Sequence, residues 1–288
     1  MLIKNTDYDD AFGGSLKQTE QSNFTILGIP FDDKTTFRKG TKGGPDAIRK
    51  ISTVRSISSF TEQGIDLYDD TNITDSGNID FSNSNEDYLE LIEQHVGEII
   101  NKDSIPVTLG GDHSVTYPAV KAVKRKYPDL NIVWIDAHPD IYEEYEGDKY
   151  SHACPLSRIL ELGGTGNIVQ GGIRATNRNL DKRIKDAGIV LYGANNFDDL
   201  NGLYLEGPTY LSMDIDALDP GFAPGVGTPV PGGISTRQLI NFIHSFDLQV
   251  VGFDLVEVNP DYDHSSITAA AAAKIIMETI ARIISLKK

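Results

Sequence analysis

The sequence predicts an α/β protein in which helices cover both faces of a mostly parallel sheet. Short apolar runs alternate along the chain with longer segments whose apolar residues recur at helical spacing. Such alternation is typical of strand–helix–strand units, which build three-layer α/β/α folds. The length of 288 residues suits one large domain or two small ones, and no long linker, internal repeat or low-complexity tract marks a second domain.

The first half of the chain begins this alternation. A helix is expected from Gly43, because Pro45 suits a first helical turn. Another is expected at 85–100, where apolar residues recur on one helical face. The polar stretch 54–84 is expected to form loops and an edge strand. The other predicted elements are strands at 23–29, 105–109 and 131–136 and a helix at 117–126.

The second half repeats the pattern and ends in a long helix. Predicted strands lie at 167–171, 189–192, 209–215 and 249–256, and predicted helices at 155–162, 180–187, 236–246 and 266–286. In open α/β sheets, ligands bind at the carboxyl ends of the strands. Functional side chains are therefore expected directly after the apolar runs.

The amino-acid composition limits which partners the protein could bind and in which cellular compartment it could lie. A net charge of −16 argues against nucleic acid, which needs clustered Lys and Arg. The single cysteine, Cys154, allows no intrachain disulfide and fits a reducing compartment. The first residues lack the apolar core of a signal peptide, and no run approaches the roughly 20 apolar residues needed to cross a bilayer. We expect a cytoplasmic protein without a membrane partner.

Three short blocks of acids and imidazoles each follow an apolar run typical of a buried strand. Charged side chains are costly to bury at such positions unless a cation neutralises them. These blocks are therefore the strongest functional signal in the sequence. The blocks are Gly110-Gly111-Asp112-His113-Ser114, Asp136-Ala137-His138-Pro139-Asp140 and Ser212-Met213-Asp214-Ile215-Asp216-Ala217-Leu218-Asp219-Pro220.

The spacing of these side chains indicates a metal site. In an extended segment, residues i, i+2 and i+4 project to one side, so the acids and imidazole of the second block can converge. With one imidazole and two carboxylates from the other blocks, the set suffices for two divalent ions if some carboxylates bridge. Oxygen and nitrogen ligands without thiolates favour Mn²⁺ over Zn²⁺. Two such ions lower the pKa of water and supply hydroxide, which could attack carbon or phosphorus. The candidate ligands are His113, Asp136, His138, Asp140, Asp214 and Asp216.

Together with three further segments, these blocks resemble the ureohydrolases, the arginase/agmatinase family. The segments are 28–32 with 40–49, 222–229 after the third block, and 254–260 (Asp-Leu-Val-Glu-Val-Asn-Pro). The resemblance covers nearly the whole chain. It implies a single domain over residues 1–288, an eight-stranded parallel sheet, two Mn²⁺ ions per subunit and a homotrimer or homohexamer. The implied reaction is hydrolysis of a small cationic guanidino compound to urea and an amine.

The resemblance also implies roles for individual residues. Glu257 would bind the guanidinium, and His152 would deliver a proton to the departing amine, although it could instead only hydrogen-bond substrate. Together with the metal ligand Asp140, these two are the expected catalytic residues. One ion would be held by His113, Asp136, Asp140 and Asp214, and the other by Asp136, His138, Asp214 and Asp216, so that Asp136 and Asp214 bridge.

The part of the site that would receive the substrate's tail differs from that of arginases. Where arginases carry an Asn that grips the α-carboxylate, this chain has Tyr142, and where they carry an Asp for the α-amino group, it has Asn177. Both differences favour agmatine as the substrate, which would be converted to putrescine and urea, as in polyamine biosynthesis. The expected substrate-binding residues are Tyr142, Asn177, His152 and Glu257. The acidic loop 141–150 could receive a free ammonium or could simply be solvated. The alternative substrates are arginine, another guanidino acid or guanidine.

Two other classes of protein fit part of the pattern. A two-metal phosphoesterase has similar ligands but usually offers Asn, Arg or Lys to phosphate, and it gives segment 254–260 no role. The other is a non-catalytic metal- or guanidine-binding protein, but an intact ligand set together with Glu257 argues against a loss of catalysis. Cys154, two residues beyond His152, could line the pocket, but a buried, inert thiol is the simpler interpretation.

Overall fold

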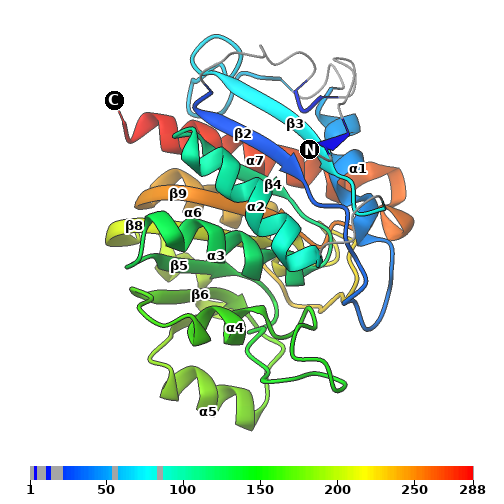
Figure 1. Cartoon of the computed structure of the whole chain (residues 1–288), viewed down its shortest axis with the longest axis vertical. Coiled ribbons are helices and arrows are strands. Elements are labelled where there is room, and N and C mark those ends of the chain that lie inside the picture. The colour runs from blue at the N-terminus through cyan, green and yellow to red at the C-terminus, as the bar shows by residue number, and fades with distance from the viewer. Residues whose placement is uncertain (1–2, 5–10, 14–21, 54–57, 83–86, 288) are drawn as a thin grey trace.

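The structure has three layers, with one sheet between two layers of helices (Figure 1). The computed structural model describes residues 3–4, 11–13, 22–53, 58–82 and 87–287. In these ranges eight strands run parallel, and a two-residue strand pairs antiparallel at one edge. Across the sheet the order is β1-β3-β2-β4-β9-β8-β5-β6-β7. The strands are β1 (Ile3–Lys4), β2 (Phe24–Gly28), β3 (Ile73–Ile79), β4 (Ile105–Leu109), β5 (Asn131–Ile135), β6 (Ile168–Ile173), β7 (Val190–Gly193), β8 (Tyr204–Asp214) and β9 (Asp247–Val256).

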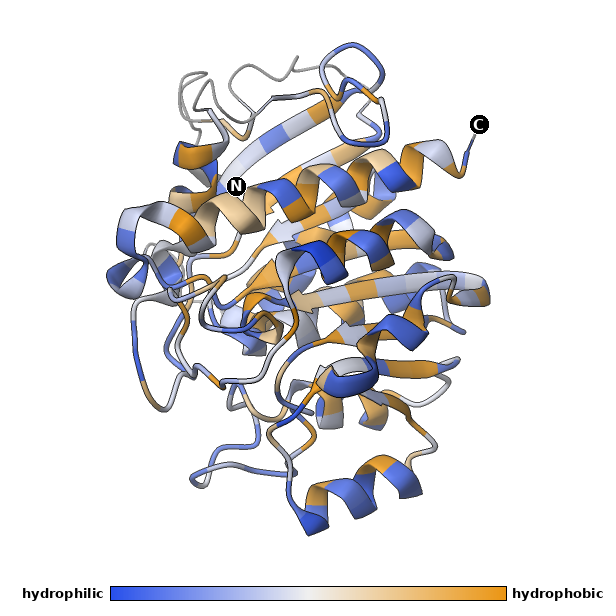
Figure 2. Ribbon diagram, turned by 180° about the vertical axis from the view of Figure 1, so that it is seen from behind, coloured by the Kyte–Doolittle hydropathy of each residue, from blue (hydrophilic) through white to orange (hydrophobic). Residues whose placement is uncertain are grey.

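Helices cover both faces of this sheet. Helices α2, α3 and α4 lie in front of it in Figure 1, whereas α1, α6 and α7 cover the other face, seen from behind in Figure 2. Helix α5 contributes two buried residues to the same core as α2, α3 and α4. The helices are α1 (Gly44–Ser52), α2 (Tyr88–Asn101), α3 (Thr116–Lys126), α4 (Pro155–Glu161), α5 (Arg178–Asp186), α6 (Thr236–Ser245) and α7 (Ile267–Ser285).

The central strands are buried on both faces, which explains their continuous apolar runs. Successive side chains of a strand project to opposite faces. In β2, Ile26 packs into the core that includes α1, α6 and α7, and Leu27 packs into the core that includes α2, α3 and α4. Val133 and Trp134 of β5 divide in the same way, and all four side chains are fully buried.

The structure confirms the predicted order of strands and helices but corrects the N-terminal edge. The strand expected at the edge is β3, which instead lies between β2 and β1. Its alternating buried and half-buried residues are typical of an edge because only one of its faces is fully covered. Strand β8 begins at Tyr204, before the expected 209, and a 3-10 helix at 194–200 had no sequence signal. Positions 54–57 and 83–86, in the predicted loop region and helix start, lie outside the described residues.

The strand order brings the three acidic blocks together. Strands β4, β9, β8 and β5 are consecutive in the middle of the sheet and run parallel. Their carboxyl ends therefore meet at one edge, where β4, β5 and β8 lead into the three acidic blocks and β9 leads into Glu257. No helix in the described ranges combines the length and apolar character that crossing a lipid bilayer requires.

Candidate metal centre

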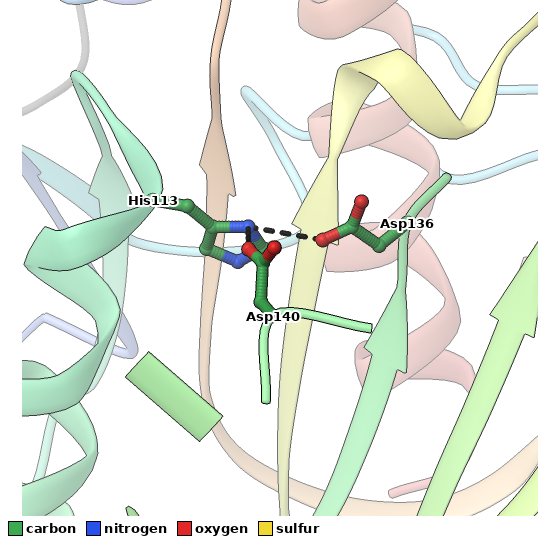
Figure 3. Close-up of side chains that lie close together, drawn as sticks. All are labelled: His113, Asp136 and Asp140. Carbon is green, nitrogen blue, oxygen red and sulfur yellow. Dashed lines mark ion pairs between the residues drawn. The ribbon is translucent and has the colours of Figure 1, made fainter. Parts of the chain in front are cut away.

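His113 places an imidazole nitrogen among three carboxylates. It begins a 3-10 turn that residues 110–112 separate from the end of β4, and its side chain is fully buried. Its Nδ1 lies 3.1 Å from Asp136 Oδ2, 3.0 Å from Asp140 Oδ2 and 3.2 Å from Asp214 Oδ2. Figure 3 shows the carboxylates of Asp136 and Asp140, both from the block after β5, directed toward the His113 ring. Within the described part of the chain, Nδ1 has no partner aligned as a hydrogen bond. A buried nitrogen facing three oxygens in this way is suited to share a cation with them.

A second group of ligand atoms lies beside the first and shares one residue with it. His138 Nδ1 is 3.0 Å from Asp216 Oδ2 and 3.5 Å from Asp136 Oδ1. The two groups that could each hold an ion are therefore His113 with Asp136 and Asp140, and Asp136 with His138 and Asp216. Asp136 offers one oxygen to each group, which is the geometry of a bridging carboxylate.

Backbone and indole N–H groups hold these carboxylates in place. Asp136 Oδ1 accepts from the His138 N–H at 2.6 Å, and Asp214 Oδ1 accepts from the Asp216 N–H at 2.7 Å. These i to i+2 contacts are a local consequence of the D-x-H and D-x-D spacing. Trp134 Nε1 donates to Asp136 Oδ2 at 2.9 Å. Asp140 takes a left-handed backbone conformation with φ of 44°, a strained geometry that aims its side chain at His113.

The clustered acids and imidazoles compete for protons. Burial raises the pKa of Asp140 to about 6 and that of Asp214 well above its usual range, and the charge of neighbouring aspartates adds to both shifts. Burial lowers the pKa of His138, but Asp216 and Asp136 outweigh it and raise that pKa to about 12. For Asp136, burial raises the pKa, but the adjacent imidazoles of His113 and His138 outweigh burial and lower it. Divalent cations would displace these shared protons and neutralise the acids, so the donor set fits two such ions.

Among the described residues that line the site, no lysine or free arginine side chain is available to neutralise these acids. The lining includes one guanidinium, that of Arg174. It donates to backbone carbonyls of Gly172, Asp216, Ala217, Leu218 and Val230. Arg174 therefore fixes the loops after β6 and β8 rather than offering itself to a ligand.

Glu257 and His152 lie beside the two groups of ligands. Glu257 directly follows β9 and has φ of 65°, again left-handed. Its Oε1 accepts from the backbone N–H of His113 at 2.9 Å and lies 3.5 Å from His152 Nδ1. Burial lowers the pKa of His152, but the bond and charge of Glu257 outweigh burial and raise it to about 9. The pKa of His152 therefore exceeds the ordinary histidine value of 6.5, because a buried carboxylate faces the ring.

The residues predicted to receive the substrate's tail line a cavity of about 410 Å³ that also reaches the acids. Tyr142 and Tyr145 lie with ring centroids 5.1 Å apart. Asn177 caps α5: its Oδ1 accepts from two backbone N–H groups of the first turn, while its Nδ2 donates to the Tyr142 hydroxyl at 3.0 Å. Asn177 thus orients Tyr142 as well as lining the cavity.

The acidic loop 141–150 does not turn its acids into this cavity. The loop residues that line the cavity are two tyrosines. Glu143 pairs with Arg183, and Asp148 pairs with Lys34 at 2.8 Å. Two of the four acids thus pair with neighbouring segments. Glu143, Glu144 and Glu146 are exposed to solvent, as the solvated interpretation anticipated.

Thr36 and Cys154 lie near the site, and the sequence pattern indicated no role for Thr36 and left that of Cys154 open. Thr36 Oγ1 lies 3.0 Å from His152 Nε2, a contact between residues 116 positions apart that spacing cannot reveal. Cys154 is fully buried, and burial raises its thiol pKa to about 12. The buried thiol is thus confirmed, and its inertness stays a prediction.

Comparison with known proteins shows the family. Residues 22–281 match the model of the Arginase family. The chain is 36% identical over 287 residues to the agmatinase of Bacillus cereus, covering 95% of this chain and 98% of that one. It is 37% identical over 279 residues to the mitochondrial arginase 1 of Arabidopsis thaliana, covering 91% and 82%. The arginase structure from Medicago truncatula matches with a TM-score of 0.86 at 34% identity, covering 91% and 88%. The chain belongs to the arginase family.

Proposed function

We propose that this arginase-family hydrolase is a binuclear manganese enzyme that converts agmatine to putrescine and urea. The observation that carries the proposal is the pair of ligand groups sharing Asp136. Beside them, one carboxylate and one imidazole remain for a guanidinium, and a cavity extends away from the acids. The proposed ligands of one ion are His113, Asp136, Asp140 and Asp214, and those of the other are Asp136, His138, Asp214 and Asp216. When bound, two such ions supply hydroxide at neutral pH by lowering the pKa of water.

Glu257 is the proposed guanidinium-binding residue. A guanidinium offers paired N–H donors that match a carboxylate in a planar, charge-assisted contact. The His113 N–H holds the Glu257 carboxylate in one orientation, so the substrate's central carbon would be held over the acids in a fixed place. Positioning is important because a resonance-stabilised guanidinium is a poor electrophile.

His152 is the proposed proton donor to the departing amine. With a pKa of about 9, it carries a proton at neutral pH. Thr36 and Glu257 contact its two ring nitrogens, so the ring is held at both ends. An acid in this position would protonate the departing nitrogen, so that it leaves as a neutral amine rather than as an amide anion, which is a poor leaving group.

The cavity favours a substrate tail without a carboxylate. Arg174, the one Lys or Arg side chain among the described lining residues, is occupied by backbone carbonyls. An α-carboxylate would therefore find neither a free cationic side chain there nor the Asn that arginases carry at the position of Tyr142. A phosphate would likewise find no free Lys or Arg among the described lining residues, which disfavours the phosphoesterase. The faces of Tyr142 and Tyr145 could instead stabilise an ammonium by cation–π contact.

A guanidino acid is the second candidate substrate, on one specific observation. Tyr142 receives a hydrogen bond from Asn177, so the hydrogen of its own hydroxyl remains free to be donated. That hydroxyl could meet the carboxylate of 4-guanidinobutyrate or arginine. A single neutral hydroxyl donor binds a carboxylate more weakly than a charged or bidentate partner would, so agmatine is preferred over a guanidino acid.

The test is steady-state kinetics with Mn²⁺ on agmatine, arginine, 4-guanidinobutyrate, 3-guanidinopropionate and guanidine. The proposal expects the highest kcat/KM for agmatine. A higher kcat/KM for 4-guanidinobutyrate would support the second candidate. Release of phosphate from a generic ester, with no urea from any guanidine, would overturn both.

A further inference from the structure

We propose that Arg183 of α5 is a positioning residue that fixes the tail end of the substrate cavity through the peptide bond between Ile141 and Tyr142. The proposal deepens the proposed function and rests on it in one respect, that the substrate's tail passes Tyr142. Arg183 is not among the described residues that line the cavity. It would therefore act on a substrate only through the residues that meet it.

The guanidinium of Arg183 donates to three partners in two segments. Its Nε donates to the Ile141 carbonyl at 2.8 Å, and its Nη2 donates to Ser157 Oγ of α4 at 3.1 Å. The other terminal nitrogen, Nη1, donates to the Glu143 carboxylate. Because the fork of a guanidinium is planar and rigid, these contacts hold the loop 141–150 in one orientation relative to α4 and α5.

The peptide bond between Ile141 and Tyr142 is held at both of its polar groups. Its carbonyl oxygen accepts from Arg183, and its N–H donates to the Ala153 carbonyl at 3.2 Å. The Ile141 side chain is fully buried in the core that also takes two residues of α5. The buried side chain and the two hydrogen bonds together fix the peptide plane, and this plane sets the direction in which the Tyr142 side chain leaves the backbone.

Helix α5 thus holds Tyr142 at both of its ends. Asn177, the N-cap of this helix, donates to the Tyr142 hydroxyl at 3.0 Å. Arg183, in the last turn of the same helix, holds the carbonyl that precedes Tyr142. Removal of Arg183 would free one end of the tyrosine while Asn177 still holds the other. This predicts a weakened tail site rather than a lost one.

The ion pair with Glu143 is not the contact that carries this role. The Glu143 side chain is 77% exposed, and exposed ion pairs contribute little because water and salt screen them. The Ile141 carbonyl, in contrast, belongs to a fully buried residue at the base of the cavity wall. A positive charge at position 183 should therefore be unable to replace the directed N–H of the guanidinium.

The first measurement compares KM and kcat for agmatine in full-length, Mn²⁺-loaded variants. Arg183→Met has no donor, and its KM should rise about 3- to 10-fold while kcat stays within about twofold of wild type. Arg183→Lys keeps a charge for Glu143 but lacks the fork, so its KM should rise as in Arg183→Met. Two controls, Glu143→Gln and Lys182→Met on the exposed side of α5, should keep KM within about twofold of wild type.

The second measurement is hydrogen exchange, which reports local opening without any turnover. Arg183→Met should speed exchange in peptides that cover residues 141–147 and leave those of β5 unchanged. Acceleration in both, with a lower melting temperature, would indicate a purely structural role and overturn the proposal. Arg183→Lys replaces Arg183→Met in both measurements if the latter does not fold.

Three further results would overturn the proposal. They are wild-type KM in Arg183→Met, full recovery of KM in Arg183→Lys, and a fall in kcat with loss of bound Mn²⁺, which would place the effect at Asp140 next to Ile141. A wild-type protein that hydrolyses no agmatine would contradict the proposed function alone. Hydrogen exchange would then still decide whether Arg183 holds this peptide bond.

Discussion

The backbone N–H of His113 donates to Oε1 of Glu257, joining a candidate metal ligand directly to the candidate substrate-binding residue. The two residues are 144 positions apart in the chain and follow adjacent strands, β4 and β9. A displacement of either strand would therefore move the metal ligand and the guanidinium site together. A substitution at Glu257 that keeps an acceptor for the His113 N–H should leave the metal centre intact. A substitution that removes this acceptor should disturb it.

Glu257→Gln should damage substrate binding without damaging the metal centre. The amide keeps an acceptor for the His113 N–H but loses the charge that pairs with a guanidinium. Hydrogen bonds to charged groups contribute about 1.5–3 kcal/mol, so kcat/KM for agmatine should fall at least ~10-fold. Metal analysis should still find wild-type Mn²⁺ content. Loss of Mn²⁺ in this variant would place Glu257 in the metal centre instead.

His152→Ala should retain metal and lose most turnover. General acid catalysis contributes typically about 10²- to 10⁴-fold, and kcat for agmatine should fall by an amount in this range. Thr36→Val serves as a partner variant, because it removes the hydroxyl next to Nε2 but leaves the acid in place, and its loss should be smaller. An unchanged kcat in His152→Ala at neutral pH would remove the proton-donor role.

The same histidine gives a direction for the pH dependence of turnover. The pKa of His152 is raised to about 9, so the ring is protonated below that pH and loses its proton above it. The acid form is therefore present at pH 7 and is lost as the pH rises through about 9. We expect kcat to fall along that alkaline limb in the wild type and this limb to be missing from the residual activity of His152→Ala. A pH profile with the same limb in both proteins would assign it to another group.

Mn²⁺ affinity should rise with pH between about 5 and 8. The raised pKa of Asp140, about 6, and those of Asp214 and His138 mean that the ligands hold protons that a cation must displace. Mn²⁺ should also raise the melting temperature, since 100-fold excess over Kd contributes about 2.7 kcal/mol to the folded state. Differential scanning fluorimetry with and without Mn²⁺ at two pH values measures both effects. A stabilisation by Mn²⁺ that is larger at pH 5.5 than at pH 8 would contradict this account.

Asn177→Ala should cost stability as well as substrate binding. It removes the cap of α5, worth about 1 kcal/mol, and the donor to Tyr142. Asn177→Asp keeps the cap but loses the N–H, so its melting temperature should stay near wild type while KM for agmatine rises as in the alanine variant. Equal KM values in Asn177→Asp and wild type would show that Tyr142 does not need this contact.

The site residues that could be predicted from the sequence are those that lie two or four positions apart within one short segment. The alternation in Asp136-Ala137-His138-Pro139-Asp140 places ligands on one side of an extended segment, and backbone N–H contacts within that block then hold them. The fold was predictable for a related reason, because strands buried on both faces leave continuous apolar runs. Thr36 beside His152, and Arg183 beside Ile141, depend on strand order and loop packing between distant segments, which no local pattern records.

The acidic loop shows a different limit of sequence reasoning. Four acids in ten residues indicate charge but not its direction. In the structure Lys34 and Arg183 pair with two of them, while tyrosines of the loop face the cavity. Composition alone could not separate the residues that fasten the loop from those that meet a ligand.

The most direct test of the central claim is the urea released from agmatine and from arginine by protein loaded with Mn²⁺. We predict two Mn²⁺ ions per chain, urea and putrescine in equal amounts from agmatine, and a lower kcat/KM for arginine. Tyr142 stands where arginases carry the Asn that grips the α-carboxylate, and Arg174, the one guanidinium among the described cavity-lining residues, is held by backbone carbonyls. A protein that binds two Mn²⁺ ions yet releases urea faster from arginine at limiting substrate, or releases none from agmatine, would contradict the account.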